Sequence, residues 1–415
     1  MRVCVIGAGV VGVSSAYFLA RQGFDVTLVD SRERPAEVSS FANGGQLSYS
    51  YVAPLAGPGV LPNVPSWLLR ADSPLRFRPR LDPHQWRWCL DFVLACRASV
   101  ARTSTAELST LSYLSRDAMH GLLAQEPIEF GHVRNGKLIA YRDADLLEKA
   151  RRLVAYQAAH GAEQSVLSAE ETLALEPALS GMRGKLAGAI YTPSEESGDC
   201  RLFTEGLFDK LKTLPNVALR MSTNVRGLRR RGAVITAADS DKGDIQAEAF
   251  VVASGLGSRA LLGPLGEDLP LYPLKGYSLS VPLAHEDDGP AISVTDYERR
   301  IVYARMGKTL RIAAMVDIGS ADAAIDPQRI ALLKRQVAEI FPRLDLDAAV
   351  AWAGLRPATP GSKPIIGPSR AAQNLWLNVG QGALGFTLAC GSAALLTAQM
   401  AGVSTPIDAT PFLPK

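Results

Sequence analysis

The sequence has few of the residues that hold metals or form disulfides. Its 415 residues include five cysteines and five histidines. No two cysteines have the CxxC spacing, and no group of cysteines and histidines has the spacing of metal ligands. An odd number of scattered cysteines is typical of a reducing compartment. We therefore expect no metal site.

The sequence also lacks a charge excess and a long apolar run. It has 44 basic and 41 acidic residues and a net charge of +3, which gives no reason to expect nucleic-acid binding. No stretch approaches the ~20 consecutive apolar residues of a membrane span. Arg2 leads directly into a short strand instead of the apolar core of a signal peptide. We expect a cytoplasmic protein, with peripheral contact to the inner face of the cell membrane as an open alternative.

Apolar periodicity predicts a βαβ unit at the N-terminus. Residues 3–6 form a short apolar run that ends in glycine, residues 12–21 have a helical pattern, and residues 24–29 favour a second strand. At the other end, residues 385–400 predict a last apolar helix that is too short to span a bilayer. Signals typical of α/β proteins therefore lie at both ends of the chain.

The middle of the chain is mixed. Residues 53–83 are rich in proline and glycine, which predicts a long irregular segment. The period-2 alternation of residues 272–316 favours an antiparallel sheet. Helices are predicted over residues 84–126, 144–161, 169–175 and 327–341, and strands over residues 217–219, 225–228, 233–238 and 249–253.

A glycine motif follows the first strand and begins the first helix. Gly7 permits a tight turn, Gly9 lets the backbone approach a pyrophosphate, and Gly12 lets helix and strand pack closely. Asp30 ends the second strand, where a carboxylate accepts hydrogen bonds from ribose hydroxyls and disfavours a 2′-phosphate. The bland alternative is a glycine-rich turn without nucleotide. Because strand, loop, helix, strand and acid occur in register, we expect a dinucleotide, FAD or NAD.

These signals predict an α/β fold in which a discontinuous Rossmann-type domain carries an inserted α+β substrate domain. The inserted domain is expected to be built on a largely antiparallel sheet. The predicted dinucleotide domain comprises residues 1–53, 145–265 and 350–415, and the substrate domain comprises residues 54–144 and 266–349, with an irregular excursion over 54–83.

Several later segments carry a family resemblance. They are residues 39–46 (SSFANGGQ), 198–201 (GDCR), 272–277 (YPLKGY), 354–357 (GLRP), 364–367 (PIIG) and 378–385 (NVGQGALG). In this order and spacing the chain resembles the D-amino acid dehydrogenase small subunits, which belong to the glycine oxidase/D-amino acid oxidase group of flavoproteins. The resemblance implies non-covalent FAD, oxidation of a D-amino acid to an imino acid that water hydrolyses to a 2-oxo acid and ammonia, and electron delivery to a quinone or another respiratory carrier.

The chain departs from the family pattern at two positions near the expected flavin site. Gln381 stands where family members usually carry His, and Phe386 stands where they often carry Trp. Residues 359–364 also lack the usual acidic residue. These departures leave FAD binding intact and leave the substrate range open.

Three residues are candidates for substrate contact. Flavin oxidation of an amine transfers hydride from Cα to flavin N5, so the protein mainly positions the substrate. An arginine fork suits the carboxylate, and the resemblance assigns that contact to Arg356 and Arg305. Tyr277 is a candidate to close over the substrate. The alternatives are a solvated or salt-bridged arginine and a half-buried sheet aromatic.

The expected cofactor contacts fall into groups at the ends of strands and the starts of helices. Residues in the 39–46 segment can reach the pyrophosphate or the flavin ring, although Asn-Gly is also a common turn dipeptide. The N-terminus of the last helix can stabilise negative charge on the reduced flavin. The full set is Gly7, Gly9, Val10, Val11, Gly12, Asp30, Ser31, Arg32, Ser39, Asn43, Gly44, Gly45, Gln46, Val225, Ala253, Ser254, Gly255, Gly354, Arg356, Gly380, Gln381, Gly382, Ala383, Leu384 and Gly385.

Other functions remain open on the sequence. A cyclic D-imino acid such as D-proline or cis-4-hydroxy-D-proline is an alternative substrate, oxygen is an alternative acceptor, and a flavin-bearing relay subunit with a partner subunit is the non-enzyme alternative. Residues 58–96 combine Trp67, Leu68, Leu69 and Trp86 with several arginines, which suits a membrane surface. The alternative for these apolar residues is ordinary core packing.

Overall fold

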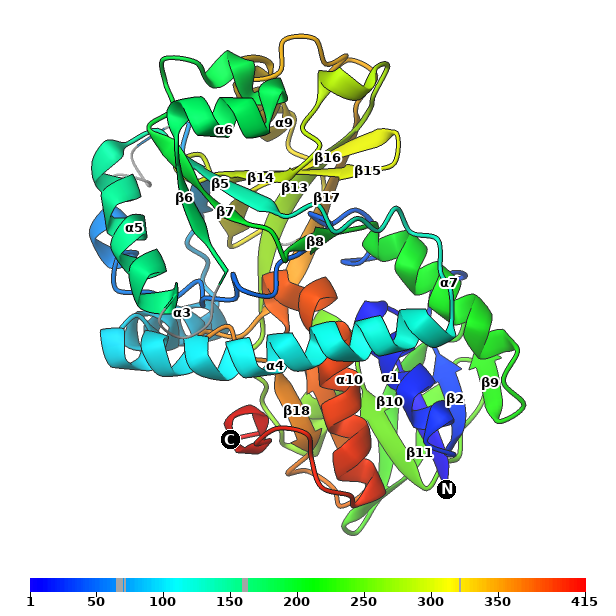
Figure 1. The fold of residues 1–415 in the computed structure, drawn as a ribbon. Coiled ribbons are helices and arrows are strands. Elements are labelled where there is room, and N and C mark those ends of the chain that lie inside the picture. The colour runs from blue at the N-terminus through cyan, green and yellow to red at the C-terminus, as the bar shows by residue number, and fades with distance from the viewer. Residues whose placement is uncertain (65–69, 71, 159–162, 321) are drawn as a thin grey trace.

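The chain folds around two large β-sheets (Figure 1). We describe it from a computed structural model over residues 1–64, 70, 72–158, 163–320 and 322–415. The first sheet has six strands and carries both chain ends, and the second has nine strands and lies above it in the view of Figure 1.

The six-stranded sheet is the predicted dinucleotide-binding sheet. Its order is β18 (Ile365–Pro368), β19 (Leu375–Val379), β12 (Ala249–Val252), β1 (Arg2–Ile6), β2 (Asp25–Val29) and β9 (Val217–Arg220). Neighbouring strands from β19 to β9 pair in parallel, and β18 pairs antiparallel with β19. In the central strands Val5 lies opposite Val251 on one side and Leu28 on the other, so β1 is buried between two apolar neighbours.

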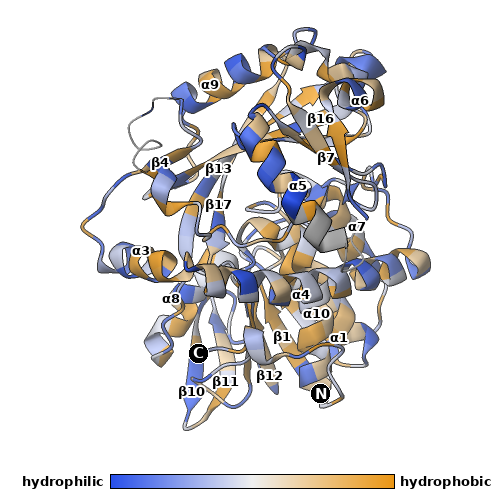
Figure 2. Cartoon of the chain, turned by 60° about the vertical axis from the view of Figure 1, so that its left-hand side comes forward, coloured by the Kyte–Doolittle hydropathy of each residue, from blue (hydrophilic) through white to orange (hydrophobic). Residues whose placement is uncertain are grey.

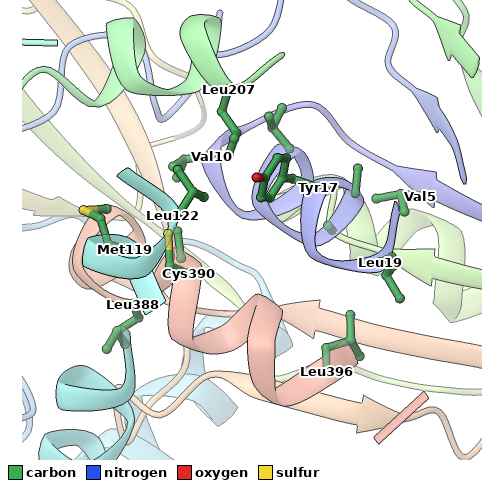
Figure 3. Packing of buried hydrophobic residues seen from close by; sticks show 14 of the residues in the cluster. Val5, Val10, Tyr17, Leu19, Met119, Leu122, Leu207, Leu388, Cys390 and Leu396 are labelled. Atoms are coloured by element: carbon green, nitrogen blue, oxygen red, sulfur yellow. The ribbon is translucent and has the colours of Figure 1, made fainter. Parts of the chain in front are cut away.

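Helices cover this sheet and form the main core. The elements involved are α1 (Val10–Arg21), α4 (Ala98–Gln125), α7 (Cys200–Lys212) and α10 (Gly385–Ala401). Figure 3 shows part of this core, with Tyr17 and Leu19 of α1, Met119 and Leu122 of α4, and Leu388 and Leu396 of α10. The sheet and these helices therefore bury one continuous apolar cluster.

The last helix is more apolar than the sequence prediction allowed. Together with the preceding 3-10 turn it covers Gly382–Ala401, which is long and apolar enough to cross a membrane by length and composition alone. Its apolar window is 61% buried inside the molecule. Because α10 packs between α1 and α4, its apolar composition is explained by its place in the core.

The nine-stranded sheet is mostly antiparallel, as predicted. Its order is β17 (Val350–Ala358), β13 (Tyr272–Pro282), β16 (Thr309–Ile318), β15 (Ile301–Met306), β14 (Ser293–Asp296), β5 (Lys137–Tyr141), β7 (Gly188–Thr192) and β6 (Ser165–Ser168), and the short edge strand β4 (Leu75–Phe77) pairs with β16. Only the β14–β5 and β16–β4 pairs among them are parallel. Helices α6 (Ala169–Leu175) and α9 (Pro327–Ala338) cover one face over an apolar cluster.

Further elements flank these two sheets. They are the hairpin β10 (Val225–Arg231)–β11 (Val234–Ser240), the small pair β3 (Gln46–Leu47)–β8 (Glu196–Ser197), and the helices α3 (Pro83–Ala95), α5 (Ala144–Ala158) and α8 (Ser258–Leu262). At the start of α6, Ser168 and Glu171 form the capping box that their spacing predicts.

Sheet membership differs from the predicted boundaries in three places. Strands β6 and β7 were expected in the dinucleotide domain, yet they pair with β5 in the nine-stranded sheet. Strand β17, also assigned to that domain, pairs along its whole length with β13. Helix α4 was expected in the substrate domain but packs on α1 and α10. Helix and strand types follow from local periodicity, whereas these pairings connect residues far apart in the chain.

Candidate active site

The loop between β1 and α1 has the shape of a pyrophosphate cradle. Gly7 has φ +114°, and a Cβ there would lie 2.6 Å from the carbonyl oxygen of Ala253. A Cβ at Gly12 would collide with the backbone of Gly7. At Gly9, by contrast, a Cβ would meet only the hydroxyl of Ser40, at 3.4 Å. The loop is closed against its own strand and open at Gly9, as close approach to a phosphate requires.

Asp30 stands at the end of β2 beside this loop. Its Oδ2 accepts a hydrogen bond of 2.6 Å from the N–H of Ala8, and its Oδ1 accepts one of 2.8 Å from the N–H of Arg32. The N–H of Thr223 donates to the carbonyl of Asp30 at 2.8 Å, which brings the start of β10 at Val225 to the same edge. Ser31 and Arg32 are exposed. The structure thus brings four of the predicted cofactor contacts, Asp30, Ser31, Arg32 and Val225, to one edge of the sheet.

A second loop, residues 39–46, crosses the face of the nine-stranded sheet. The hydroxyl of Ser39 donates to the carbonyl of Leu355 on β17 at 2.7 Å. The hydroxyl of Ser278 on β13 donates to the carbonyl of Ala42 at 2.7 Å. We call this segment the 39–46 loop. It links the nucleotide end of the molecule to the sheet above it.

Arg311 on β16 holds the same loop. Its Nη1 donates to the carbonyl of Asn43 at 2.7 Å, and its Nη2 donates to Oδ2 of Asp199 at 2.9 Å. Both side chains are shielded from solvent, and burial lowers the pKa of Arg311 while Asp199 opposes that shift. Next to it, Gly45 has φ +64° and its carbonyl accepts from the N–H of Gly198 at 2.9 Å. Neither Arg311 nor Asp199 was singled out from the sequence.

The C-terminal glycine cluster forms a third wall. Gly380 has φ +84°, and a Cβ there would lie 2.8 Å from Thr359. Gly382, Ala383 and Leu384 form a 3-10 turn, and α10 then begins at Gly385, where a Cβ would meet nothing within 4 Å. The start of α10 therefore presents an open backbone and a positive dipole end.

The residues after β12 lie between the β1–α1 loop, the 39–46 loop and the C-terminal glycine cluster. Ala253 touches the backbone of Gly7, and Ser254 hydrogen bonds with Ser258 at 3.1 Å. Gly255 has φ +56° and lies beside the ring of Pro357 in the GLRP segment. Segments that are distant in the sequence therefore meet around one site.

Arg356 is placed on the sheet face that the 39–46 loop crosses. Its guanidinium lies across Gly276, where a Cβ would collide with it. Gly276 and Ser278 point to the same face because side chains alternate along β13. Nη1 of Arg356 donates to the carbonyl of Met315 at 3.2 Å, and burial lowers the pKa of Arg356 to about 10, while Asp317 raises it. Within the described residues Arg356 has no ion pair, so most of its donors are available to a ligand.

A β-bulge aims the carbonyl that Arg356 contacts. The register of β13 and β16 shifts between Lys275 and Tyr277, and Met315 in the bulge has φ +68°. This left-handed conformation is costly for a residue with a side chain. It turns the carbonyl of Met315 toward the guanidinium, where the carbonyl accepts the hydrogen bond from Arg356.

Tyr277 faces away from this side of the sheet, which corrects the expectation that it closes over the substrate. It is only 1% exposed and packs in the apolar cluster under α9. Its hydroxyl donates to Oδ2 of Asp317 at 3.0 Å, and burial raises its pKa. Side chains alternate between the two faces of a strand. Tyr277 stands between Gly276 and Ser278, so it points to the face opposite theirs.

Arg305 is not brought together with Arg356, contrary to the expectation that both hold one carboxylate. Strand β13 serves to compare their positions. Through β16, Arg305 lies level with Val281 of β13, whereas Arg356 lies directly opposite Leu274 of β13. Seven residues of β13 separate the two levels, which is about 23 Å along the strand. Nη2 of Arg305 instead donates to the carbonyl of Gly289 at 2.6 Å. The alternation of each strand was predictable, but this register was not.

Two departures from the family pattern lie behind the site. Gln381 is buried, and its Nε2 donates to Oδ1 of Asn378 at 2.6 Å. Phe386 is also buried and contacts the rings of Phe130 and Phe203. Both side chains are committed to packing or to an internal hydrogen bond.

The geometry fits an adenine dinucleotide whose redox ring lies under the larger sheet. The open Gly9, the carboxylate of Asp30 and the start of α10 supply the contacts that pyrophosphate, ribose and a reduced flavin need. Arg356 adds a cation with unused donors on the adjoining face. These features define the class of FAD-dependent oxidoreductases.

Comparison with known proteins gives the family. The family model described as "FAD dependent oxidoreductase" (DAO) matches residues 2–399, and the chain belongs to this family. It is 51% identical over 422 residues to a protein named D-amino acid dehydrogenase 2 from Ralstonia nicotianae, covering 99% of each chain. It is 48% identical to a protein of the same name from Pseudomonas aeruginosa, covering 100% of this chain and 98% of that one.

Solved structures share the fold. Glycine oxidase from Geobacillus kaustophilus superposes with a TM-score of 0.78 at 20% identity, covering 100% of this chain and 98% of that chain. L-proline dehydrogenase from P. horikoshii superposes with a TM-score of 0.77 at 16% identity, covering 100% and 96%. At these identities the likeness supports the fold, which confirms the predicted α/β class.

Proposed function

We propose that this chain oxidises D-amino acids on FAD to 2-oxo acids and ammonia. Two relatives at 51% and 48% identity over nearly the whole chain carry the name D-amino acid dehydrogenase 2. The single observation that carries the substrate class is Arg356, a shielded arginine without an ion pair in the described residues. A planar fork in that setting suits a carboxylate.

The chemistry needs little acid–base machinery from the chain. When bound, FAD would supply the oxidant that accepts the Cα hydrogen of the neutral amine as a hydride. Arg356 holds the substrate carboxylate and so orients Cα, and the N-terminus of α10 stabilises the negative charge that the reduced cofactor gains. Water then hydrolyses the imino acid to the 2-oxo acid and ammonia.

A substrate panel tests this proposal. The purified holoprotein is offered D-amino acids and their L enantiomers with an artificial dye acceptor, with and without oxygen. We expect dye reduction with several D enantiomers, little with the L forms, and no dependence on oxygen. Preference for L enantiomers would reject the substrate class, and fast turnover with oxygen alone would favour an oxidase. Turnover by the isolated chain would reject the relay-subunit alternative.

The cyclic imino acid alternative is tested in the same panel. It was motivated by Gln381 and Phe386, and both side chains are buried and engaged with other residues. D-proline and cis-4-hydroxy-D-proline are therefore expected to be no better than the best acyclic substrate. A much higher kcat/KM for either of them would favour this alternative.

We further propose that electrons leave to a quinone at the inner face of the cell membrane, with α3 as the membrane contact. Trp86, Leu90, Val93 and Leu94 are each more than 40% exposed, and their spacing puts them on one side of the helix. Arg87 lies beside them with its side chain 72% exposed. Exposed apolar residues with a basic flank suit anionic headgroups. Figure 2 shows α3 at the periphery of the molecule. Trp67, Leu68 and Leu69 lie outside the described residues.

A further inference from the structure

A buried lysine lies behind the 39–46 loop. Lys137, on β5, is only 6% exposed and forms no ion pair in the described part of the chain. Its ammonium donates to Oε1 of Gln46 and to the hydroxyl of Ser48, both at 2.9 Å. It also lies 4.7 Å from the ring centroid of Tyr51. An ammonium in such a place needs a reason, because burying a charge without a direct counter-ion is costly.

Its partner Gln46 lies where two cofactor segments meet. Gln46 ends the 39–46 loop and begins β3. Its carbonyl accepts from the hydroxyl of Thr387 in the first turn of α10 at 3.3 Å, and its Nε2 donates to the hydroxyl of Ser293 at 2.6 Å. The side chain is half-buried, whereas Lys137 behind it is buried.

We propose that Lys137 is a positioning residue of the flavin site, which acts by fixing the orientation of the Gln46 carboxamide. An ammonium has donors only, so it selects the oxygen end of the amide. The NH₂ end is then directed to Ser293 and keeps a second hydrogen for the site. If the ammonium is lost, the carboxamide of Gln46 can rotate, and its oxygen then takes the position that the NH₂ group held. A donor favours a reduced flavin and an acceptor opposes it.

The surroundings make this orientation sensitive to pH. Burial lowers the pKa of Lys137 to about 8, while Glu195 opposes the shift. Burial also raises the pKa of Glu195, whose Oε1 accepts from the N–H of Ser50 at 2.9 Å and whose Oε2 has no hydrogen-bond partner in the described residues. The hydrogen-bond and ring partners of the ammonium are uncharged: the carboxamide of Gln46, the hydroxyl of Ser48 and the ring of Tyr51. The ammonium is present below its pKa, so the orientation weakens as the pH rises through about 8.

The visible spectrum of the bound flavin tests this without substrate. The holoprotein is titrated from about pH 6.5 to 9.5, a range that includes the pKa expected for Lys137. We expect a spectral transition near pH 8 in the parent and none in Lys137→Met. In Gln46→Glu the transition moves to higher pH, because a carboxylate favours the ammonium. Lys149→Met, which removes an exposed lysine of α5, is the matched control and should titrate like the parent.

Turnover gives a second readout, which rests on the proposed amine oxidation. Lys137→Met should lower kcat/KM at pH 7 roughly tenfold, the effect of losing one charge-assisted hydrogen bond, with no further fall toward pH 9. Lys137→Arg keeps the charge and should restore the spectrum at pH 7 without a transition near pH 8. It serves as the test if the Met variant does not bind FAD. A parent-like transition in either variant overturns the proposal. Failure of all D-amino acids would reject the proposed function and leave the spectral result intact.

Discussion

Arg311 and Asp199 form an ion pair of 2.9 Å between the nine-stranded sheet and the start of α7. Asp199 also caps α7 by accepting from the N–H of Arg201 at 2.8 Å. The other nitrogen of Arg311 donates to the carbonyl of Asn43. One arginine therefore joins three elements and fixes the 39–46 loop against β16.

Removing this arginine should loosen the cofactor. Arg311→Met leaves Asp199 shielded without its counter-ion and frees the loop at Asn43. Losing one partner of a buried pair costs about 3–5 kcal/mol. We expect a lower FAD content after purification and a weaker Kd for added FAD, measured by flavin fluorescence.

A double-mutant cycle separates the ion pair from the loop contact. Asp199→Asn keeps the shape of the cap but leaves the buried Arg311 without its counter-ion, so it should also destabilise the fold. In the combined variant the loss should be smaller than the sum of the two single losses, because no uncompensated charge remains. Strict additivity of the unfolding free energies would show that the pair does not couple.

Arg356→Lys should reduce turnover while leaving FAD binding intact. Lysine keeps the charge but cannot form the bidentate contact, and losing such a contact costs about 2–5 kcal/mol of transition-state binding. We expect a large fall in kcat/KM for D-amino acids, with parental flavin absorbance. A Lys variant as active as the parent would remove Arg356 from the proposed role.

Arg305→Lys is the informative comparison. Arg305 contacts backbone carbonyls near Gly289 at the far end of the sheet from Arg356. We expect its Lys variant to keep kcat/KM within about threefold of the parent, as is usual away from a site. A loss equal to that of Arg356→Lys would mean that both arginines act on one substrate.

Local patterns explain why much of the fold was predictable. The order of Gly7, Gly9, Gly12 and Asp30 is contained in thirty residues, and the same order forms the β1–α1–β2 cradle. The alternation along β13 and β16 likewise identified antiparallel strands. Period and glycine spacing depend on neighbours in the chain, which the sequence shows directly.

The rest depends on pairings between distant residues. Alternation shows that Gly276 and Tyr277 face opposite sides of β13, but the choice of the loop side depends on where Ala42 docks. In the same way, the distance between Arg305 and Arg356 follows from the register of four strands. Arg311 was missed because one arginine in an apolar strand has no local signature of an ion pair.

Asp317 is expected to be a stability centre. It is fully buried and accepts from Arg76 on β4, from Arg329 on α9 at 2.7 Å, and from the hydroxyl of Tyr277. Asp317→Asn keeps the volume but leaves buried arginine charge uncompensated, which costs about 3–5 kcal/mol. We expect a clearly lower Tm in a thermal melt. Asp326→Asn, at a more exposed member of the same cluster, should lower the Tm less.

Membrane binding by α3 can be tested separately from dye-linked activity. Trp86→Gln combined with Leu90→Gln removes two exposed apolar side chains while leaving Trp88, which is buried in the same helix, in place. We expect weaker co-sedimentation with anionic liposomes and slower quinone reduction, because burial of apolar area and attraction to headgroups both contribute to interfacial binding. Dye-linked activity should survive, since the dye reaches the flavin from solution. Leu175→Gln, which changes an exposed leucine of α6, is the control and should bind liposomes like the parent. No liposome binding by the parent protein, or equal binding by the α3 variant, would eliminate this surface as the membrane contact.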